Sequence, residues 1–242
     1  MPTPVYYANC PDYTPEDLQS ALGGILPGQI DAFGGVSGKR IMLKPNLLAW
    51  RRADDIACVH PKLIVETARF FLDAGAKEVA LLENPAVQTA PAIIRSMGID
   101  EELKKLGVHV ANFSDYKRLP LPPEVKFHNI ELAAEFLEYD AVADIAKAKT
   151  HAMMILTLCV KNLFGLVKGC DRMGWHLAVG RDFAKFADML LDIYLSVRPR
   201  FNILDAVTCM EGNGPGSGTP VHRGFLAGSS DSLALDASAA AI

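Results

Sequence analysis

Residues 144–176, DIAKAKTHAMMILTLCVKNLFGLVKGCDRMGWH, join a buried-strand pattern to an unusual concentration of positive charge. The apolar run 141–145 leads directly into Lys147, Lys149 and His151. From Lys147 to Cys170 there is no acidic residue, although the whole chain has a net charge of −4. These cations either face water as a basic surface or line a pocket that binds an anion from outside the chain. The apolar Leu163 and Phe164, directly after Lys161 and Asn162, favour the pocket.

Composition limits the classes of protein that this chain can represent. Its 242 residues, 50% of them hydrophobic, suffice for the core of one large or two small domains. The negative net charge argues against a general nucleic-acid binder. The N-terminus has neither the basic nor the apolar region of a signal peptide, and no run of about 18 apolar residues predicts a membrane span. We therefore expect a cytoplasmic protein with no nucleic-acid or membrane partner.

Strand and helix patterns alternate along the chain and predict an α/β fold. We expect a mostly parallel sheet with helices on both faces, built from doubly wound, Rossmann-like halves. Strands are predicted at 39–43, 77–83, 108–113, 141–145, 201–204 and 225–227, and helices at 62–73, 132–137, 156–167 and 183–197, among others.

The expected domain organisation has two parts. Residues 1–38 form an N-terminal extension with a first helix, and 39–242 form the main domain, with the proline-rich 117–123 crossing between two lobes. The last residues are an apolar helical pattern without a C-cap, which predicts that the natural chain continues past Ile242.

Polar side chains follow four of the predicted strands. Lys44 and Asn46, Glu83 and Asn84, Lys147 and Lys149, and Asp205 all stand at carboxyl ends, where open α/β sheets bind ligands. The residues predicted to bind an anionic substrate are Lys44, Asn46, Lys147, Lys161, Asn162, Arg172 and Asn213. Those predicted to be catalytic are His151, His176, Lys149 and Glu211. The histidines would transfer protons near neutral pH. A lysine beside other cations could be a base or an imine-forming nucleophile, but simple charge pairing with a substrate carboxylate or phosphate is the preferred interpretation.

Two further features are weaker candidates. The glycine-rich 211–218, EGNGPGSG, matches no nucleotide-binding loop and is interpreted as an active-site loop that brings Glu211 and Asn213 inward. Asp205 and Asp231 could supply oxygen ligands, but the spacing of the acidic residues fits no recognised loop, so no metal site is predicted. The five cysteines form no C-x-x-C pair, which excludes a readable zinc or cluster site and is typical of a reducing compartment.

In combination, several motifs resemble the DUF362 family. They are IMLKPNLL, the K-x-K-x-H of 147–151, the K-N-x-x-G of 161–165 and the E-G-x-G-P of 211–215, and the similarity runs from about Lys39 to the end. The resemblance implies an α/β fold, a set of pocket residues and a redox context, because many members continue into a ferredoxin-like module with cysteine-rich cluster motifs. This sequence contains no such motif, so an iron–sulfur cluster is expected only in a missing C-terminal module or a partner.

Two functions are compatible with these observations. The chain is either an enzyme domain, of oxidoreductase or lyase type, acting on a small anionic carboxylate or phosphate metabolite with electrons from an iron–sulfur module, or a non-catalytic binding or scaffold domain for such a module. Convergence of His151, His176 and Glu211 on the lysines would favour the enzyme.

Overall fold

A computed structural model of the chain describes residues 3–50, 55–85, 87–178 and 182–242. Within them, an eight-stranded sheet has the order β1-β10-β9-β7-β2-β3-β4, with β8 paired to β7 outside this path. The strands are β1 (Tyr6–Asn9), β10 (Thr219–Ser229), β9 (Phe201–Glu211), β7 (Ala141–His151), β2 (Arg40–Pro45), β3 (Glu78–Leu82), β4 (His109–Ala111) and β8 (Ile155–Thr157). The pairs from β9 to β4 are parallel, whereas β1, β10 and β8 pair antiparallel. The prediction of a mostly parallel α/β sheet is confirmed.

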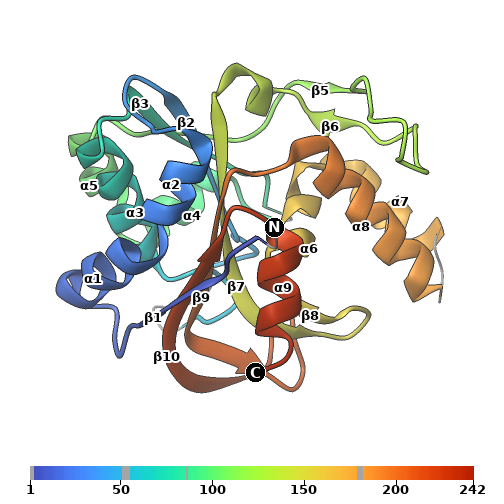
Figure 1. The fold of residues 1–242 in the computed structure, drawn as a ribbon. Helices are drawn as coiled ribbons and strands as arrows, with labels where there is room; N and C mark the ends of the chain where they lie inside the picture. Colours follow the sequence, from blue (N-terminus) through green and yellow to red (C-terminus); the bar gives the residue numbers. More distant parts are fainter. Residues whose placement is uncertain (1–2, 51–54, 86, 179–181) are drawn as a thin grey trace.

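Helices cover both faces of this sheet (Figure 1). One face carries α1 (Pro15–Ile25), α2 (Pro27–Phe33), α3 (Pro61–Asp73), α4 (Ala90–Ser96) and α5 (Asp100–Lys105). The other carries α6 (Cys159–Asn162), η2 (Leu163–Leu166), α7 (Gly169–Ala178), α8 (Phe183–Val197) and α9 (Ser232–Ala239). Successive residues of a strand point to opposite faces, so Ile41 and Leu43 join the first core while Met42 between them joins the second. The predicted covering of both faces is therefore confirmed.

The order of the strands reverses between β2 and β7. From β2 the chain runs through α3 to β3 and through α4 and α5 to β4, each strand added on the same side. It returns through β5 (Tyr116–Lys117), β6 (Leu132–Ala133) and η1 (Glu135–Glu138) to β7 on the opposite side of β2, and then through α8 to β9. Connections leave the carboxyl ends of β2 and β7 in opposite directions, which opens a crevice between them.

The N-terminal segment belongs to the same sheet and core. β1 pairs with β10 in the register Tyr6 to Gly228, and Leu18 and Leu22 of α1 are fully buried with Phe71 of α3. Residues 117–123 lie in the connection between β4 and β7, beginning at the end of β5.

Two predicted helices are wrong. The pattern at 156–167 is divided into β8, α6 and η2, because Ile155 has a φ of 64° and the following residues pair with β7 before the chain turns into α6. The pattern at 132–137 begins instead as β6, because Leu132 and Ala133 pair with β5. In both segments a tertiary contact overrides a local preference.

β7 and β9 are much longer than predicted, because their polar residues have buried partners. Asp205 on β9 accepts hydrogen bonds from the Tyr13 hydroxyl at 2.7 Å, from the His60 backbone N–H at 3.0 Å and from the Lys147 ammonium at 2.9 Å. Tyr13 stacks on His60 with 3.6 Å between ring centroids, and Lys147 and Asp205 are 3% and 0% exposed. This network joins β7 and β9 to the N-terminus of α3 and to the start of the chain.

We predict that Asp205→Ala lowers the free energy of unfolding by about 3–5 kcal/mol, because it leaves the Lys147 ammonium buried without a counter-charge. Tyr13→Phe keeps that ion pair and should cost only about 1–2 kcal/mol. Urea unfolding of both variants measures the difference. A loss under about 1 kcal/mol for Asp205→Ala would contradict the proposed role of the network.

Candidate functional site

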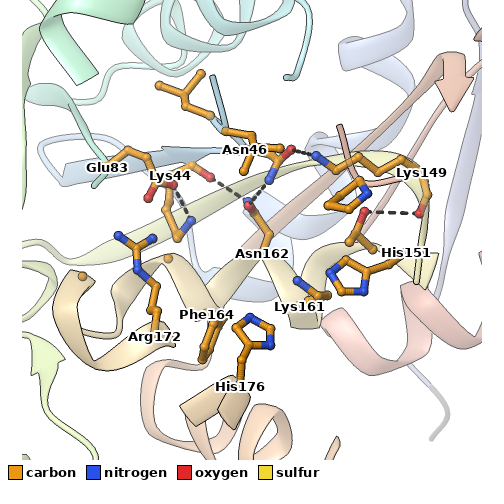
Figure 2. A pocket seen from close by; sticks show the side chains of 16 residues that line it. Lys44, Asn46, Glu83, Lys149, His151, Lys161, Asn162, Phe164, Arg172 and His176 are labelled. Carbon is orange, nitrogen blue, oxygen red and sulfur yellow. Dashed lines mark hydrogen bonds and ion pairs between the residues drawn. The ribbon is translucent and has the colours of Figure 1, made fainter. Parts of the chain in front are cut away.

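A cavity of about 340 Å³ occupies the crevice between the carboxyl ends of β2 and β7, closed by α6, η2 and α7. We call it the switch cavity (Figure 2). Its lining residues are Lys44, Asn46, Leu47, Leu48, Glu83, Lys149, His151, Thr157, Lys161, Asn162, Phe164, Gly165, Gly169, Arg172, His176 and Pro215. Most of the residues predicted from sequence to bind an anion or to be catalytic are therefore brought together.

The floor of the switch cavity is a buried ion pair. Lys44, in β2, donates to the Glu83 carboxylate at 2.6 Å, and the two side chains are 0% and 3% exposed. Gly165 seals this pair, because a Cβ atom there would lie 2.6 Å from Glu83 Oε1 and 2.8 Å from Lys44 Nζ. Lys44 thus lines the cavity, but its charge is neutralised within the protein.

The Asn162 side chain ties α6 to the ends of both strands. Its Nδ2 donates to Asp144 Oδ1 at 2.7 Å and to the backbone carbonyls of Lys44 at 3.2 Å and Ile145 at 3.4 Å. Backbone carbonyls only accept hydrogen bonds, so this orientation of the amide is fixed. Its Oδ1 must then accept from Asn46 Nδ2, at 3.0 Å, and Asn46 Oδ1 is left to accept from Lys149.

Among the residues that the structure describes, Lys149 has polar partners but no carboxylate partner. Its Nζ donates to Asn46 Oδ1 at 2.8 Å and to the Ala57 carbonyl at 2.5 Å, and the residue is 3% exposed. Burial is the main cause that lowers its pKa to about 7; Cys58 and Asp55 oppose this shift, and the charges of Lys161 and Lys147 add to it. The two acceptors take two of the three non-carbon positions of the nitrogen. Near pH 7 the third position therefore alternates between a third N–H and a lone pair.

Lys161 is a half-buried cation on α6 and directly precedes Asn162 in the sequence. Within the described part of the chain its ammonium makes no hydrogen bond or ion pair, and it lies 6.0 Å from the centroid of the Phe164 ring. Burial lowers its pKa to about 8, and the charge of Lys44 adds to this effect. Lys161 thus carries the uncompensated positive charge that an anionic ligand would neutralise.

His151 presents a neutral N–H group to the cavity. Its Nδ1 accepts hydrogen bonds from the backbone N–H groups of Met153 at 3.1 Å and Met154 at 3.2 Å, which assigns the ring proton to Nε2. Burial is the main cause that lowers its pKa to about 4, and the charges of Lys161, His176 and Lys149 act in the same direction. At neutral pH we therefore assign His151 as a hydrogen-bond donor to a ligand oxygen rather than as the base predicted from sequence.

Arg172 and His176 reach the cavity from α7. Arg172 Nη2 donates to the Asn84 carbonyl at 2.6 Å, and the guanidinium has further N–H groups for a ligand. The His176 ring stacks on Phe186 and meets Phe164 edge-on, with centroid distances of 4.8 and 5.3 Å. Burial lowers its pKa, and Lys161 lowers it further. Figure 2 shows His151, Lys161 and His176 pointing toward one another from β7, α6 and α7.

Other predicted site residues lie elsewhere. Lys147 is paired with Asp205, outside the cavity lining. Glu211 pairs with Arg223 at 3.2 Å and Asn213 is exposed, so the glycine-rich loop contributes Pro215 to the cavity and neither of its predicted residues. The convergence expected of an enzyme thus holds for the two histidines but not for Glu211.

The metal candidates have structural partners. Asp205 belongs to the network with Lys147, and Asp231 caps α9 through the backbone N–H groups of Leu233 and Ala234. Among the residues that the structure describes, no group of three or more His, Cys, Asp and Glu side chains is arranged to hold a metal ion. Cys10, Cys58 and Cys159 are buried free thiols.

Several lining residues were not predicted from the sequence. Glu83 was recognised only as a strand end, and its partnership with Lys44 needs the parallel pairing of β2 and β3. Thr157, Phe164 and Gly165 were assigned to a helix, which concealed their contact with the cavity. For Gly165 the signal was present in the K-N-x-x-G spacing, since a glycine there allows the close approach to the ion pair.

Comparisons with known proteins agree with this architecture. The family described as "Domain of unknown function (DUF362)" matches residues 41–241. The thylakoid-associated protein sll1697 of Synechocystis sp. is 33% identical over 199 residues, which are 82% of this chain and 61% of that protein. The chain thus spans less than two thirds of this relative. Of the described helices, none has the length and apolar character needed to cross a membrane.

Two solved structures resemble the chain at 13% identity. The lactate racemase apoprotein from Thermoanaerobacterium thermosaccharolyticum has a TM-score of 0.52 and is matched over 95% of this chain and 55% of its own. A protein from Thermotoga maritima has a TM-score of 0.45, with 97% and 60% covered. The first of these likenesses supports the α/β fold.

We predict that Glu83→Leu lowers the free energy of unfolding by about 3–5 kcal/mol, because it leaves the Lys44 ammonium buried beneath Gly165 without a counter-charge. The double variant Lys44→Met/Glu83→Leu should unfold within about 1 kcal/mol of the parent, or be more stable, since no charge is then buried. Urea denaturation of the two variants tests the difference. Equal losses would show that the site depends on packing and not on charge.

Proposed function

The chain belongs to the DUF362 family, and we propose that it binds a small carboxylate in the switch cavity and acts as an enzyme that transfers protons to or from the bound molecule. The observation that carries the proposal is the half-buried Lys161 ammonium, which has no counter-anion among the described residues and lies in the same cavity as Lys149, whose pKa is lowered to about 7. Arg172 adds a second cation to the lining.

The balance of charge in the cavity supports an anionic ligand. Glu83 is the carboxylate among the lining residues, and Lys44 neutralises it. Asp144 lies nearby, but burial raises its pKa to about 8, so it is protonated at pH 7 and adds no negative charge. Lys161 and Arg172 therefore leave an excess of positive charge, which a carboxylate on the ligand would balance.

The polar groups divide into three tasks. Lys161 and Arg172 would hold the carboxylate, and the Nε2–H of His151 would donate to a second oxygen of the ligand. Lys149 would supply or remove a proton, because a pKa of about 7 keeps both of its forms populated at neutral pH. Lactate, the compound in the name of the structural neighbour, has this carboxylate and second oxygen and is therefore the first probe.

A non-catalytic binding domain is the alternative, and it needs the same cations but no proton-transfer group. The titration of Lys149 near pH 7 favours the enzyme, since a lysine that only bound an anion would do so best with a permanent charge. The cytoplasmic location and the ferredoxin-like module or partner, with its iron–sulfur cluster, stay predictions from the sequence and the family resemblance.

We predict that Lys161→Met weakens the binding of lactate at least about tenfold and also raises the free energy of unfolding by roughly 1–2 kcal/mol. Both effects arise because methionine removes an unpaired ammonium while keeping most of the apolar volume. Calorimetric titration and urea unfolding measure them. Lys185→Met, an exposed lysine on α8, is the matched control and should change neither.

An unchanged affinity for lactate in Lys161→Met would show that the anion does not bind to Lys161 in this cavity. Titrations with phosphate in parallel distinguish a general anion site from one that selects carboxylates. Equal affinities for phosphate and lactate would contradict the carboxylate preference.

We predict that lactate affinity falls as the pH rises from about 6 to 9. In the free protein burial lowers the pKa of Lys149 to about 7 and of Lys161 to about 8. A bound anion raises both pKa values, so the complex holds more protons than the free protein and binding takes up protons between these limits. Calorimetry at pH 8 in two buffers of different ionisation enthalpy measures this uptake, and an affinity that is constant over this range would contradict it.

A further inference from the structure

We infer that Lys149 is a nucleophile that forms an imine with the carbonyl carbon of a 2-oxo acid held in the switch cavity. The inference rests on the proposed function, since the carboxylate of the acid must first be held by Lys161 and Arg172. It adds a substrate class, the 2-oxo acids, and a covalent step that proton transfer alone does not require.

The hydrogen bonds of Lys149, which lines the cavity, leave one position on its nitrogen without a partner among the described residues. Its two acceptors, Asn46 Oδ1 at 2.8 Å and the Ala57 carbonyl at 2.5 Å, take two N–H groups of a neutral amine. Asn46 cannot reverse its amide, because its Nδ2 is committed to Asn162, whose own amide is fixed by backbone carbonyls. The remaining position on the nitrogen is a lone pair whenever the amine is neutral. Burial lowers the pKa of this amine to about 7, so about half of the molecules carry the nucleophile at pH 7.

Two other buried lysines of this chain have a structural role, and their partners differ from those of Lys149. Lys44 and Lys147 are each within 2.9 Å of a buried carboxylate, Glu83 and Asp205 respectively, with which they form ion pairs. Lys149 is as buried as Lys147 and lies two residues away on the same strand, yet its partners are a neutral amide and a backbone carbonyl. Such neutral acceptors are compatible with a free amine.

The surrounding groups fit the remaining atoms of a 2-oxo acid. Lys161 and Arg172 line the same cavity and could pair with its carboxylate, and the neutral Nε2–H of His151 could donate to its carbonyl oxygen and so polarise the carbon under attack. The cavity of about 340 Å³ has room for a 2-oxo acid and lies at the lower end of the range of small-molecule sites.

The step balances without an oxidant or a reductant. The lone pair of Nζ forms a bond to the carbonyl carbon while the π electrons move to the oxygen, which takes up a proton. The carbinolamine then loses its hydroxyl group as water, and both hydrogens of the original amine leave the nitrogen, so amine and ketone give imine and one water. Protonation of the imine returns one N–H, for which Asn46 Oδ1 or the Ala57 carbonyl is the acceptor.

The test is reductive trapping. The full chain is incubated at pH 7 with pyruvate and sodium cyanoborohydride, and the product is examined by intact mass and peptide mapping. We expect one adduct per chain, on Lys149, and none when lactate replaces pyruvate, since lactate has the carboxylate but no carbonyl. Lys149→Met should remove the adduct, whereas Lys185→Met should keep it, with thermal melting to confirm that both variants fold.

Calorimetric binding of pyruvate and lactate, measured in parallel, separates the two proposals. Binding of both acids without an adduct on Lys149, or with adducts only on exposed lysines, would overturn the imine and leave the carboxylate site standing. Binding of neither acid, together with no adduct, would overturn both. Because the adduct is mapped in the unmodified chain, the inference can fail even if Lys149→Met does not fold.

Discussion

The hydrogen bonds of the Asn162 amide set the geometry of the whole site. The carbonyls of Lys44 and Ile145 belong to neighbouring parallel strands, and one Nδ2 group bridges both of them. Adjacent residues of a helix point about 100° apart, so Asn162 directed at the strand ends places Lys161 toward the switch cavity. The same amide transmits a fixed orientation through Asn46 to Lys149. Two of the cavity's cations are therefore positioned by one side chain (Figure 2).

The topology of the sheet explains why this amide has two strand ends to bridge. Reversal of the strand order between β2 and β7 sends their connections apart and leaves the carboxyl ends of these two strands accessible to α6. α6 is short, and it meets the sheet at this gap with its last residue. On the N-terminal side, the α6 backbone N–H groups of Cys159 and Val160 bond to Asp236 of α9, at 2.8 and 2.9 Å. α6 is thus held at both ends, which makes a one-turn helix rigid enough to carry Lys161.

Much of the site could be predicted from the sequence, because parallel strands bring their carboxyl ends to one edge. The position at strand ends predicts Lys44, Asn46 and Lys149 as site residues. Lys161 is instead indicated by the lack of acidic residues around it in the sequence. The pairing of each lysine could not be predicted. Lys147 and Lys149 share one face of β7 and look equivalent in sequence, but Asp205, 58 residues from Lys147, neutralises only one of them. The partner of Lys44 is similarly 39 residues away.

The secondary-structure prediction was wrong in the segment that carries Lys161, and for a related reason. The pattern at 156–167 has the composition of a helix, and nothing local indicates the positive φ of Ile155 or the pairing of β8 with β7. The turn into α6 is stabilised by contacts of Asn162 with residues 17 and 118 positions away. A continuous helix over these residues would carry Asn162 and Gly165 out of register with the strand ends and the Lys44–Glu83 pair. The functional geometry thus depends on an element that local propensity opposes.

A lysine without a carboxylate partner adds nothing to folding that the ion-paired lysines nearby do not already contribute. Lys44 in β2 and Lys147 in β7 are balanced by buried carboxylates, so this sheet accommodates lysine with a counter-charge. Lys161 lacks such a partner in the described chain, and the Asp144 carboxyl, which accepts a hydrogen bond from Asn162, is mostly protonated at neutral pH because burial raises its pKa to about 8. Desolvation of an ammonium without compensation costs stability, and this cost falls at the one cavity where β2, β7, α6 and α7 meet. A bound carboxylate, as the proposed function supposes, would balance this charge and remove that cost.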